Sequence, residues 1–287
     1  MPAIRGARPI RNKEVATFHN ELVPSSTTLD EYAYVFSAWL NFSNDKSIKG
    51  LENFSHRDYT QGTSQTFDHF VMKHNANRCI VALKGEFQYH RCVSKFAEFK
   101  ELGLVHPDLL YGPDMHALII SAPFSDYGCV HPEFETVLTM CNDFNIPVCL
   151  DLAYWGIAKN VHIDLDKWPC IKEVTCSLSK PFFTLENHRV GIRFTRDYSD
   201  DGISMLNEVK MQNEYSMALG VEYMKSFGPD YNWEKYKDLY ESVCEKESLI
   251  YTDTVIFGLG DSERHAEFHR GIPGNYRVCV SEWLGDV

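Results

Sequence analysis

The stretch Cys149–Gly191, CLDLAYWGIAKNVHIDLDKWPCIKEVTCSLSKPFFTLENHRVG, decides the fold class of this chain. It contains two short apolar runs, one ending at Asp151 and the other at Cys176, and each is typical of a buried strand. Polar residues follow both runs, and the second group is Ser177-Leu-Ser179-Lys180. Because open α/β sheets bind ligands beyond the carboxyl ends of their strands, these residues predict a ligand site.

Lys180 and Asp151 are the most informative pair in this stretch. A lysine amine that is partly desolvated and flanked by small hydroxyls suits a Schiff base better than an ion pair. The neighbouring hydroxyls of Ser177 and Ser179 can bind a phosphate, and Asp151 can keep a pyridine nitrogen protonated. Pyridoxal phosphate (PLP) needs this set of groups, so the pattern predicts PLP as the cofactor.

The segments on either side alternate between apolar strands and amphipathic helices. We predict strands over 78–83, 117–121, 147–151 and 190–194, with a helix between the second and third that begins near His131. A capping box, Thr28 to Glu31, begins a helix that continues to Leu40. The alternation predicts an α/β fold with a mainly parallel sheet and flanking helices.

Several weaker patterns complete the expected organisation. Apolar residues at 96, 99 and 102 predict a helix ending at Gly103, and the polar segment 41–57 is expected to be mostly loop. Long helical patterns follow residue 197, and strands are expected over 254–258 and near 276–280. Gly62-Thr63-Ser64 begins another helix, where free N–H groups and hydroxyls form a phosphate site or, alternatively, an ordinary helix cap.

Composition excludes several classes of protein. The net charge of −12 and the pI near 5.4, with no compensating basic stripe, argue against a nucleic-acid partner. No apolar run approaches the roughly 20 residues that span a bilayer, and the basic N-terminus lacks the apolar core of a secretory signal. The nine cysteines lack metal-site spacing and are expected to be reduced, so we predict a cytoplasmic protein without membrane contact.

The ordered set Asp151-x-x-Tyr154, Ser177-x-Ser179-Lys180 and Arg189-Val-Gly resembles the fold type I PLP enzymes, and class I/II aminotransferases in particular. The resemblance covers about Gly62 to Gly191 and the arginine of Tyr276-Arg277. It implies a large domain, expected over 50–196, and a small domain formed by 1–49 and 197–287, which is shorter than usual in that family. It also implies a homodimer.

The resemblance also implies residue roles. Lys180 would hold PLP as a Schiff base and act with Asp151 and Tyr154 in catalysis, with Asp151 at the pyridine nitrogen and Tyr154 at the phenolic oxygen. Arg277 would bind the substrate carboxylate as a bidentate pair. The phosphate would be bound by Gly62, Thr63, Ser64, Ser177, Ser179 and Arg189.

Two cofactor positions are less clearly defined. The aromatic ring that stacks on PLP is expected at Tyr89, with Phe87 as the second choice. Ser125 stands where the family usually has the asparagine that contacts the phenolic oxygen. Asp126 is an alternative for this contact, although an acid would repel a phenolate.

The predicted function is therefore a PLP-dependent aminotransferase that moves an amino group from an amino acid donor to a keto acid. Three alternatives stay open: another PLP reaction at Cα or Cβ, a non-catalytic PLP-fold protein, and an α/β protein that binds no PLP. The Gly258-Leu-Gly motif lacks the third glycine of a dinucleotide site. NAD is therefore not expected as a cofactor. His265 and His269 lack a third ligand, so a metal is not expected either.

Overall fold

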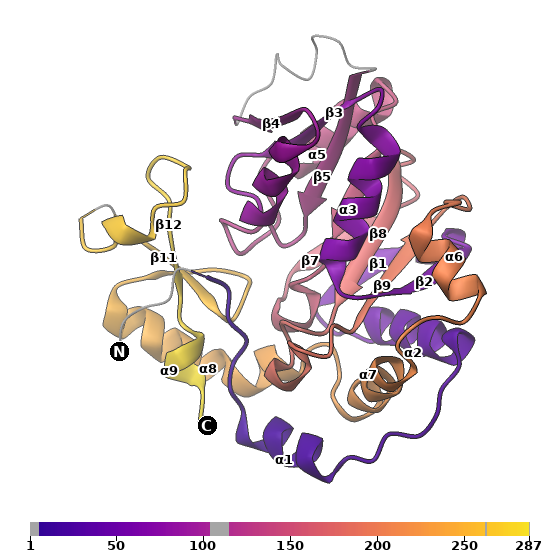
Figure 1. Ribbon diagram of the computed structural model, residues 1–287. Helices are drawn as coiled ribbons and strands as arrows, with labels where there is room; N and C mark the ends of the chain where they lie inside the picture. The colour runs from indigo at the N-terminus through magenta and orange to yellow at the C-terminus, as the bar shows by residue number, and fades with distance from the viewer. Residues whose placement is uncertain (1–5, 104–114, 262, 287) are drawn as a thin grey trace.

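The computed structural model describes residues 6–103, 115–261 and 263–286. Its centre is a seven-stranded sheet in which one strand, β9, runs antiparallel to both of its neighbours and the others run in one direction. The predicted α/β class with a mainly parallel sheet is therefore confirmed (Figure 1). In spatial order the strands are β2 (His56–Thr60), β9 (Gly191–Thr195), β8 (Ile171–Ser177), β6 (Val148–Asp151), β5 (His116–Ser121), β3 (Cys79–Leu83) and β4 (Phe99–Leu102).

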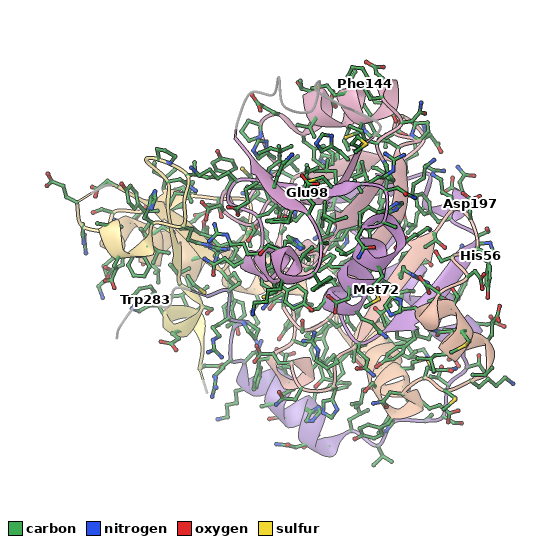
Figure 2. All side chains as sticks on the ribbon, turned by 45° about the horizontal axis from the view of Figure 1, so that its top comes forward. His56, Met72, Glu98, Phe144, Asp197 and Trp283 are labelled. Atoms are coloured by element: carbon green, nitrogen blue, oxygen red, sulfur yellow. The ribbon has the colours of Figure 1, made fainter. Side chains whose placement is uncertain are left out.

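Helices cover both faces of this sheet because its central strands are apolar on both sides. Ile80 and Ile119 face α3, whereas Val81 and Ile120 belong to the larger core on the opposite face. Figure 2 shows the side chains that fill these layers, with Phe144 at the end of one covering helix far from Trp283 near the C-terminus. The covering helices are α2 (Leu29–Asn41), α3 (Thr63–His74), α5 (Phe134–Asp143) and α7 (Glu214–Ser226).

A smaller C-terminal unit lies beside the large sheet and has its own apolar cluster (Figure 1). It contains a three-stranded antiparallel sheet packed on a long helix. Tyr154 and Ile157, next to the large sheet, also belong to this cluster and join the two units. Its elements are α8 (Tyr231–Glu247), β10 (Ile250–Tyr251), β11 (Phe257–Gly260), β12 (Tyr276–Cys279) and α9 (Ser281–Leu284).

The remaining helices and strands lie at the periphery. β1 (Lys46–Lys49) pairs in parallel with β7 (Val161–Asp164) in a separate two-stranded sheet. α1 (Lys13–Glu21) packs near the short helix Phe183–Leu185, and α6 (Gly202–Glu208) packs on β2. None of the helices within the described ranges is both long and apolar enough to cross a bilayer.

The apolar clusters divide the chain differently from the expected domain boundaries. Tyr32 and Phe36 of α2 and Met217 of α7 are buried in the core of the large sheet, although both helices were expected in the small domain. The separate C-terminal cluster draws its helical residues from α8 onward, beginning with Trp233. We therefore propose a boundary near residue 228 in place of the expected one after residue 196.

Two local expectations are wrong. The segment expected to be a helix ending at Gly103 contains strand β4, which pairs in parallel with β3 at the edge of the sheet. The segment 41–57, expected to be loop, contributes β1 and the start of β2. In both places, hydrogen bonding to a neighbouring strand outweighs a local pattern too short to specify a structure.

Candidate active site

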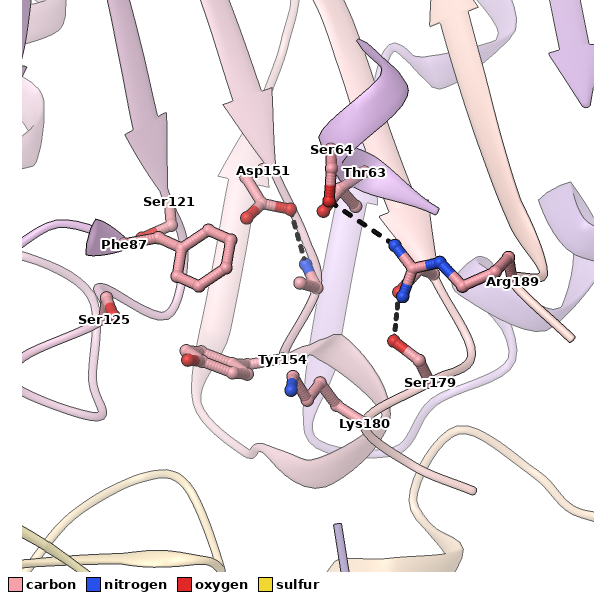
Figure 3. A pocket seen from close by; sticks show the side chains of 12 residues that line it. Thr63, Ser64, Phe87, Ser121, Ser125, Asp151, Tyr154, Ser179, Lys180 and Arg189 are labelled. Carbon is pink, nitrogen blue, oxygen red and sulfur yellow. Dashed lines mark hydrogen bonds between the residues drawn. The ribbon is translucent and has the colours of Figure 1, made fainter. Parts of the chain in front are cut away.

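The carboxyl ends of β5, β6 and β8 and the N-terminus of α3 surround a pocket with an empty volume of about 510 Å³ (Figure 3). It brings together side chains that are far apart in the sequence, because parallel strands end at the same edge of the sheet. Its lining residues are Thr63, Ser64, Phe87, Ser121, Ser125, Asp151, Ala153, Tyr154, Ser177, Ser179, Lys180 and Arg189.

Lys180 lies on the turn that follows β8, three residues beyond the end of the strand. Its side chain is partly buried and lines the pocket, and Nζ donates a hydrogen bond to the carbonyl oxygen of Ala7 at 3.0 Å. The Ala7 segment therefore reaches the pocket from the N-terminal end of the chain. This single neutral acceptor leaves the amine without a carboxylate partner among the bonds that the structure shows.

Asp151 ends strand β6, adjacent to β8. Its carboxylate is buried, lines the pocket and accepts a hydrogen bond from the N–H of Ala153 at 2.9 Å. Burial, with a contribution from the nearby Glu86, raises the pKa of Asp151 to about 8, and the Ala153 hydrogen bond and Lys180 partly oppose this rise. The cofactor-free pocket therefore holds Asp151 largely protonated at neutral pH.

The opposite side of the pocket can bind an anion. Gly62 precedes α3 with a φ of +78°, and no side chain caps the helix, so its first N–H groups are available. Arg189 Nη2 lies 3.4 Å from Ser64 Oγ, and the hydroxyls of Ser177 and Ser179 lie 3.0 Å apart (Figure 3). Together they provide a helix N-terminus, a guanidinium and several hydroxyls around one space, which is a favourable environment for a phosphate.

The backbone conformation at Gly62 favours glycine, and a side chain there would also disturb the anion site. A Cβ there would lie 2.7 Å from Arg189 Nη2 and would displace the guanidinium. Arg189 itself adopts a left-handed conformation with a φ of +57°, which is uncommon for a residue with a side chain. The backbone is thus held in unusual conformations on both sides of the anion site.

The aromatic side of the pocket differs from the expectation. Phe87, the second choice, lines the pocket, whereas Tyr89, the first choice, does not. The Tyr89 hydroxyl donates to both carboxylate oxygens of Asp68 at 2.8 Å, and its ring stacks on Phe87 with centroids 5.9 Å apart. Tyr89 therefore supports Phe87 from behind.

Tyr154 and Ser125 both line the pocket (Figure 3). Tyr154 is buried, and its ring packs edge-on against Phe257 of the C-terminal unit, with centroids 5.4 Å apart. Ser125 follows the end of β5 and is also buried. The two hydroxyl-bearing side chains thus come from different loops but face one cavity.

Arg277 is placed one layer behind the pocket. Its buried guanidinium donates to the main-chain oxygen of Ser125, lies 3.3 Å from Ser125 Oγ and covers the ring of Phe257 at 4.1 Å. Arg277 is therefore not among the lining residues, and its visible contacts position the Ser125 loop.

Ser121 and Ala153 also line the pocket, although neither was predicted as a site residue from the sequence. Ser121 is the last residue of β5 and pairs in register with Asp151 on β6. The position of Ser121 at the end of an apolar strand was the signal that could have identified it. Ala153 contributes through its backbone N–H, which no sequence pattern reveals.

No protein-family model and no curated protein sequence match this chain. Solved structures do match. An aspartate aminotransferase from Thermus thermophilus with maleate aligns with a TM-score of 0.64 at 14% identity, over 96% of this chain and 86% of that one. A methionine aminotransferase from Escherichia coli aligns with a TM-score of 0.67 at 11% identity, over 96% and 89%.

A PLP-bound C-S lyase from Staphylococcus hominis, in complex with L-cycloserine, aligns equally well. Its TM-score is 0.66 at 13% identity, over 94% of this chain and 80% of that one. Proteins with different PLP reactions thus share this architecture, so the likeness establishes the fold and not the reaction. The chain has the fold of the PLP-dependent transferases of fold type I.

Proposed function

We propose that this protein is a PLP-dependent aminotransferase that moves an amino group between an amino acid and a keto acid. The observation that carries the proposal is one pocket that joins Lys180 and Asp151 to the anion site at the start of α3. An amine, a buried carboxyl group and a phosphate cradle are what PLP requires of a protein. The architecture shared with aminotransferases supports the same reading.

The residues present fit this cofactor. The free helix N-terminus beside Arg189 suits a phosphate, and a side chain at Gly62 would occupy the same space. The buried Asp151 faces the pocket from the sheet, where a basic ring nitrogen would relieve the cost of its desolvation. Phe87 supplies an aromatic face to the same pocket.

PLP, when bound, supplies an electron sink for the bonds at the substrate Cα. In our proposal Lys180 Nζ would hold the cofactor through its aldehyde carbon and, once released by an amino substrate, would carry a proton away from Cα. Asp151 would keep the ring nitrogen protonated. The anion site fixes the phosphate, so the reacting carbon stays beside Lys180.

The remaining residues orient the cofactor and the substrate. Tyr154 and Ser125 face the pocket with hydroxyls that can donate to the phenolic oxygen. The ring of Phe87, with Tyr89 stacked behind it, would pack on one face of the cofactor. Arg277 fixes the Ser125 loop from one layer behind the pocket, and its guanidinium would have to turn from Ser125 toward the pocket to bind the substrate carboxylate.

We further propose a homodimer in the cytoplasm. All nine cysteines are free, and seven of them are buried, which suits a reducing compartment. The dimer is inferred from the shared architecture, and analytical ultracentrifugation of the PLP-loaded protein tests it directly.

The reaction is tested by incubating the PLP-loaded protein with amino acid donors and a keto acid, then identifying products by mass spectrometry. We expect a new amino acid with the carbon skeleton of the keto acid. Lys180→Ala should lower this rate by about 10²–10⁴-fold, because it removes the proton carrier. Lys159→Ala is the matched control, since Lys159 covers the ring of Trp233 and does not line the pocket.

The second candidate is β-elimination from a sulfur-containing amino acid. It is favoured by the equal likeness to the C-S lyase and by Ser125 at a position where the aminotransferase family usually has asparagine. The same incubation separates the two reactions. Release of ammonia, an α-keto acid and a thiol from the donor, when no keto acid has been added as acceptor, would replace transamination by elimination.

A further inference from the structure

Glu86 is a buried carboxylate directly behind the pocket. It follows strand β3, and its Oε1 accepts hydrogen bonds from the N–H of Ser121 at 2.6 Å and from Ser121 Oγ at 2.8 Å. Oε2 accepts from Ser121 Oγ at 2.8 Å and from the N–H of Phe87 at 3.0 Å. Glu86 therefore holds two residues that line the pocket, although it does not line the pocket itself.

Ser121 connects this carboxylate to Asp151. Ser121 and Asp151 are register partners at the ends of the adjacent parallel strands β5 and β6, and the N–H of Ala122 donates to the Asp151 main-chain oxygen at 2.9 Å. Register partners in parallel strands point to the same face of the sheet. The side chain of Ser121 thus lies on the same face of the sheet as that of Asp151, and its hydroxyl is hydrogen-bonded to Glu86.

The positive charges around Glu86 and Asp151 do not offset two negative charges at these carboxyl groups. Burial is the main effect that raises the pKa of Glu86, to about 7, and hydrogen bonds from Ser121 and Phe87 and the charge of Arg270 oppose it. The positive charge of Lys180 lowers the pKa of Asp151 and so partly opposes its rise. Two neighbouring thiols, Cys149 and Cys176, have raised pKa values and stay neutral. Two neighbouring carboxyl groups in a buried site do not both ionise at neutral pH.

We propose that Glu86 is a positioning residue that keeps a proton on Asp151 until PLP binds, so that the pocket itself protonates the cofactor ring nitrogen. The proton leaves the Asp151 carboxyl oxygen and bonds to the nitrogen lone pair, and a carboxylate remains opposite the cation. No other reactant is needed. This inference rests on the proposed function for the identity of the ligand.

The first test uses the cofactor-free protein. The Asp151 carboxyl is followed by ¹³C NMR as a function of pH and assigned with Asp151→Asn. In Glu86→Gln, which keeps the shape and loses the charge, the pKa of Asp151 should fall by roughly one unit or more. Glu98→Gln is the control, because Glu98 is exposed and bonded to Lys100. An unchanged Asp151 titration in Glu86→Gln would overturn the inference.

A reciprocal measurement tests the inference even if the Glu86→Gln variant does not fold. Coupled groups affect each other equally, so the pKa of Glu86 should fall by the same amount in Asp151→Asn. A Glu86 titration indifferent to that change also overturns the inference.

The second test measures proton uptake during PLP binding by calorimetry at neutral pH, in buffers with different heats of ionisation. Glu86→Gln should take up more protons than the unaltered protein, by up to about one, because its Asp151 starts ionised. Equal proton uptake by the two proteins contradicts the inference and leaves the proposed function intact. If PLP binds neither protein, the proposed function fails, and the inference fails with it.

Discussion

At the residue scale, Gly62 is the most restrictive position in the site. Its φ of +78° with ψ of 174° is a conformation nearly confined to glycine. We expect Gly62→Ala to raise the dissociation constant for PLP by about tenfold or more, equivalent to about 1.4 kcal/mol, because the new Cβ displaces Arg189. Fluorescence titration with PLP measures this constant.

Gly228 provides the matched control for that substitution. A Cβ at Gly228 meets no atom within 4 Å, and the residue has no left-handed conformation. Gly228→Ala should bind PLP as the unaltered protein does. Equal affinity in both variants would show that the anion site does not depend on Gly62.

Arg277 is the second informative residue. We expect Arg277→Lys to raise KM for amino donors about tenfold with a smaller effect on kcat, because lysine cannot form a bidentate pair with a carboxylate. Steady-state kinetics over several donors measures both constants. Arg264→Lys is the control, since Arg264 is half-exposed and bonded to Glu247. A change in kcat without a change in KM would indicate that Arg277 only positions the Ser125 loop and does not bind the substrate carboxylate.

The candidate site was partly predictable at this scale, for a physical reason. Asp151 and Lys180 lie at or just beyond the carboxyl ends of apolar strands. These ends meet at one edge of a parallel sheet, independently of the conformation of the connecting loops. The choice between Phe87 and Tyr89 depended on the turn between β3 and the next helix, which a sequence pattern does not specify. Glu86 was missed because its role depends on a hydrogen bond to Ser121, 35 residues away.

At the scale of the elements, α2 was predicted from its cap and its spacing, and the structure confirms both. The hydroxyl of Thr28 accepts from the N–H of Glu31, and the apolar face packs under the sheet. The edge strand β4 was predicted to be a helix, because three apolar residues are too few to distinguish the periodicity of a helix from that of a strand. Its neighbour β3 supplies the hydrogen bonds that decide the outcome.

The burial of α2 predicts a large difference between two aromatic residues of one helix. Phe36 is fully buried and Tyr34 is 71% exposed. Phe36→Ala should lower the free energy of unfolding by about 3–5 kcal/mol through cavity formation. Tyr34→Ala should change it by less than about 0.5 kcal/mol. Urea denaturation measures both values, and similar losses would place α2 outside the core.

At the scale of the whole molecule, the boundary between the two hydrophobic cores could not be predicted from the sequence. Helices α2 and α7 come from segments outside the motifs that carry the family resemblance, yet they pack on the large sheet. Only the three-dimensional contacts separate them from α8 and the C-terminal strands. The pocket lies beside the junction of the two units, where Tyr154 contacts Phe257.

The buried carboxyl groups also affect the stability of the whole cofactor-free protein. Asp151 and Glu86 have raised folded-state pKa values, so the native state binds more protons than the unfolded state between their unfolded values, about 4, and their folded values of about 8 and about 7. Stability should therefore fall as pH rises through this range and level off above it. Thermal unfolding from pH 5 to 9 measures this, and Glu86→Gln should flatten the decline. A decline of equal slope in both proteins would contradict the linkage.

The central claim is that Lys180 binds PLP covalently. The most direct measurement is borohydride reduction of the PLP-loaded protein, followed by peptide mapping and by an absorbance spectrum before and after reduction. We predict a visible absorbance band that reduction abolishes, with one pyridoxyl group on the peptide that contains Lys180. No band with excess PLP, or label spread over exposed lysines such as Lys225 and Lys167, would contradict the account.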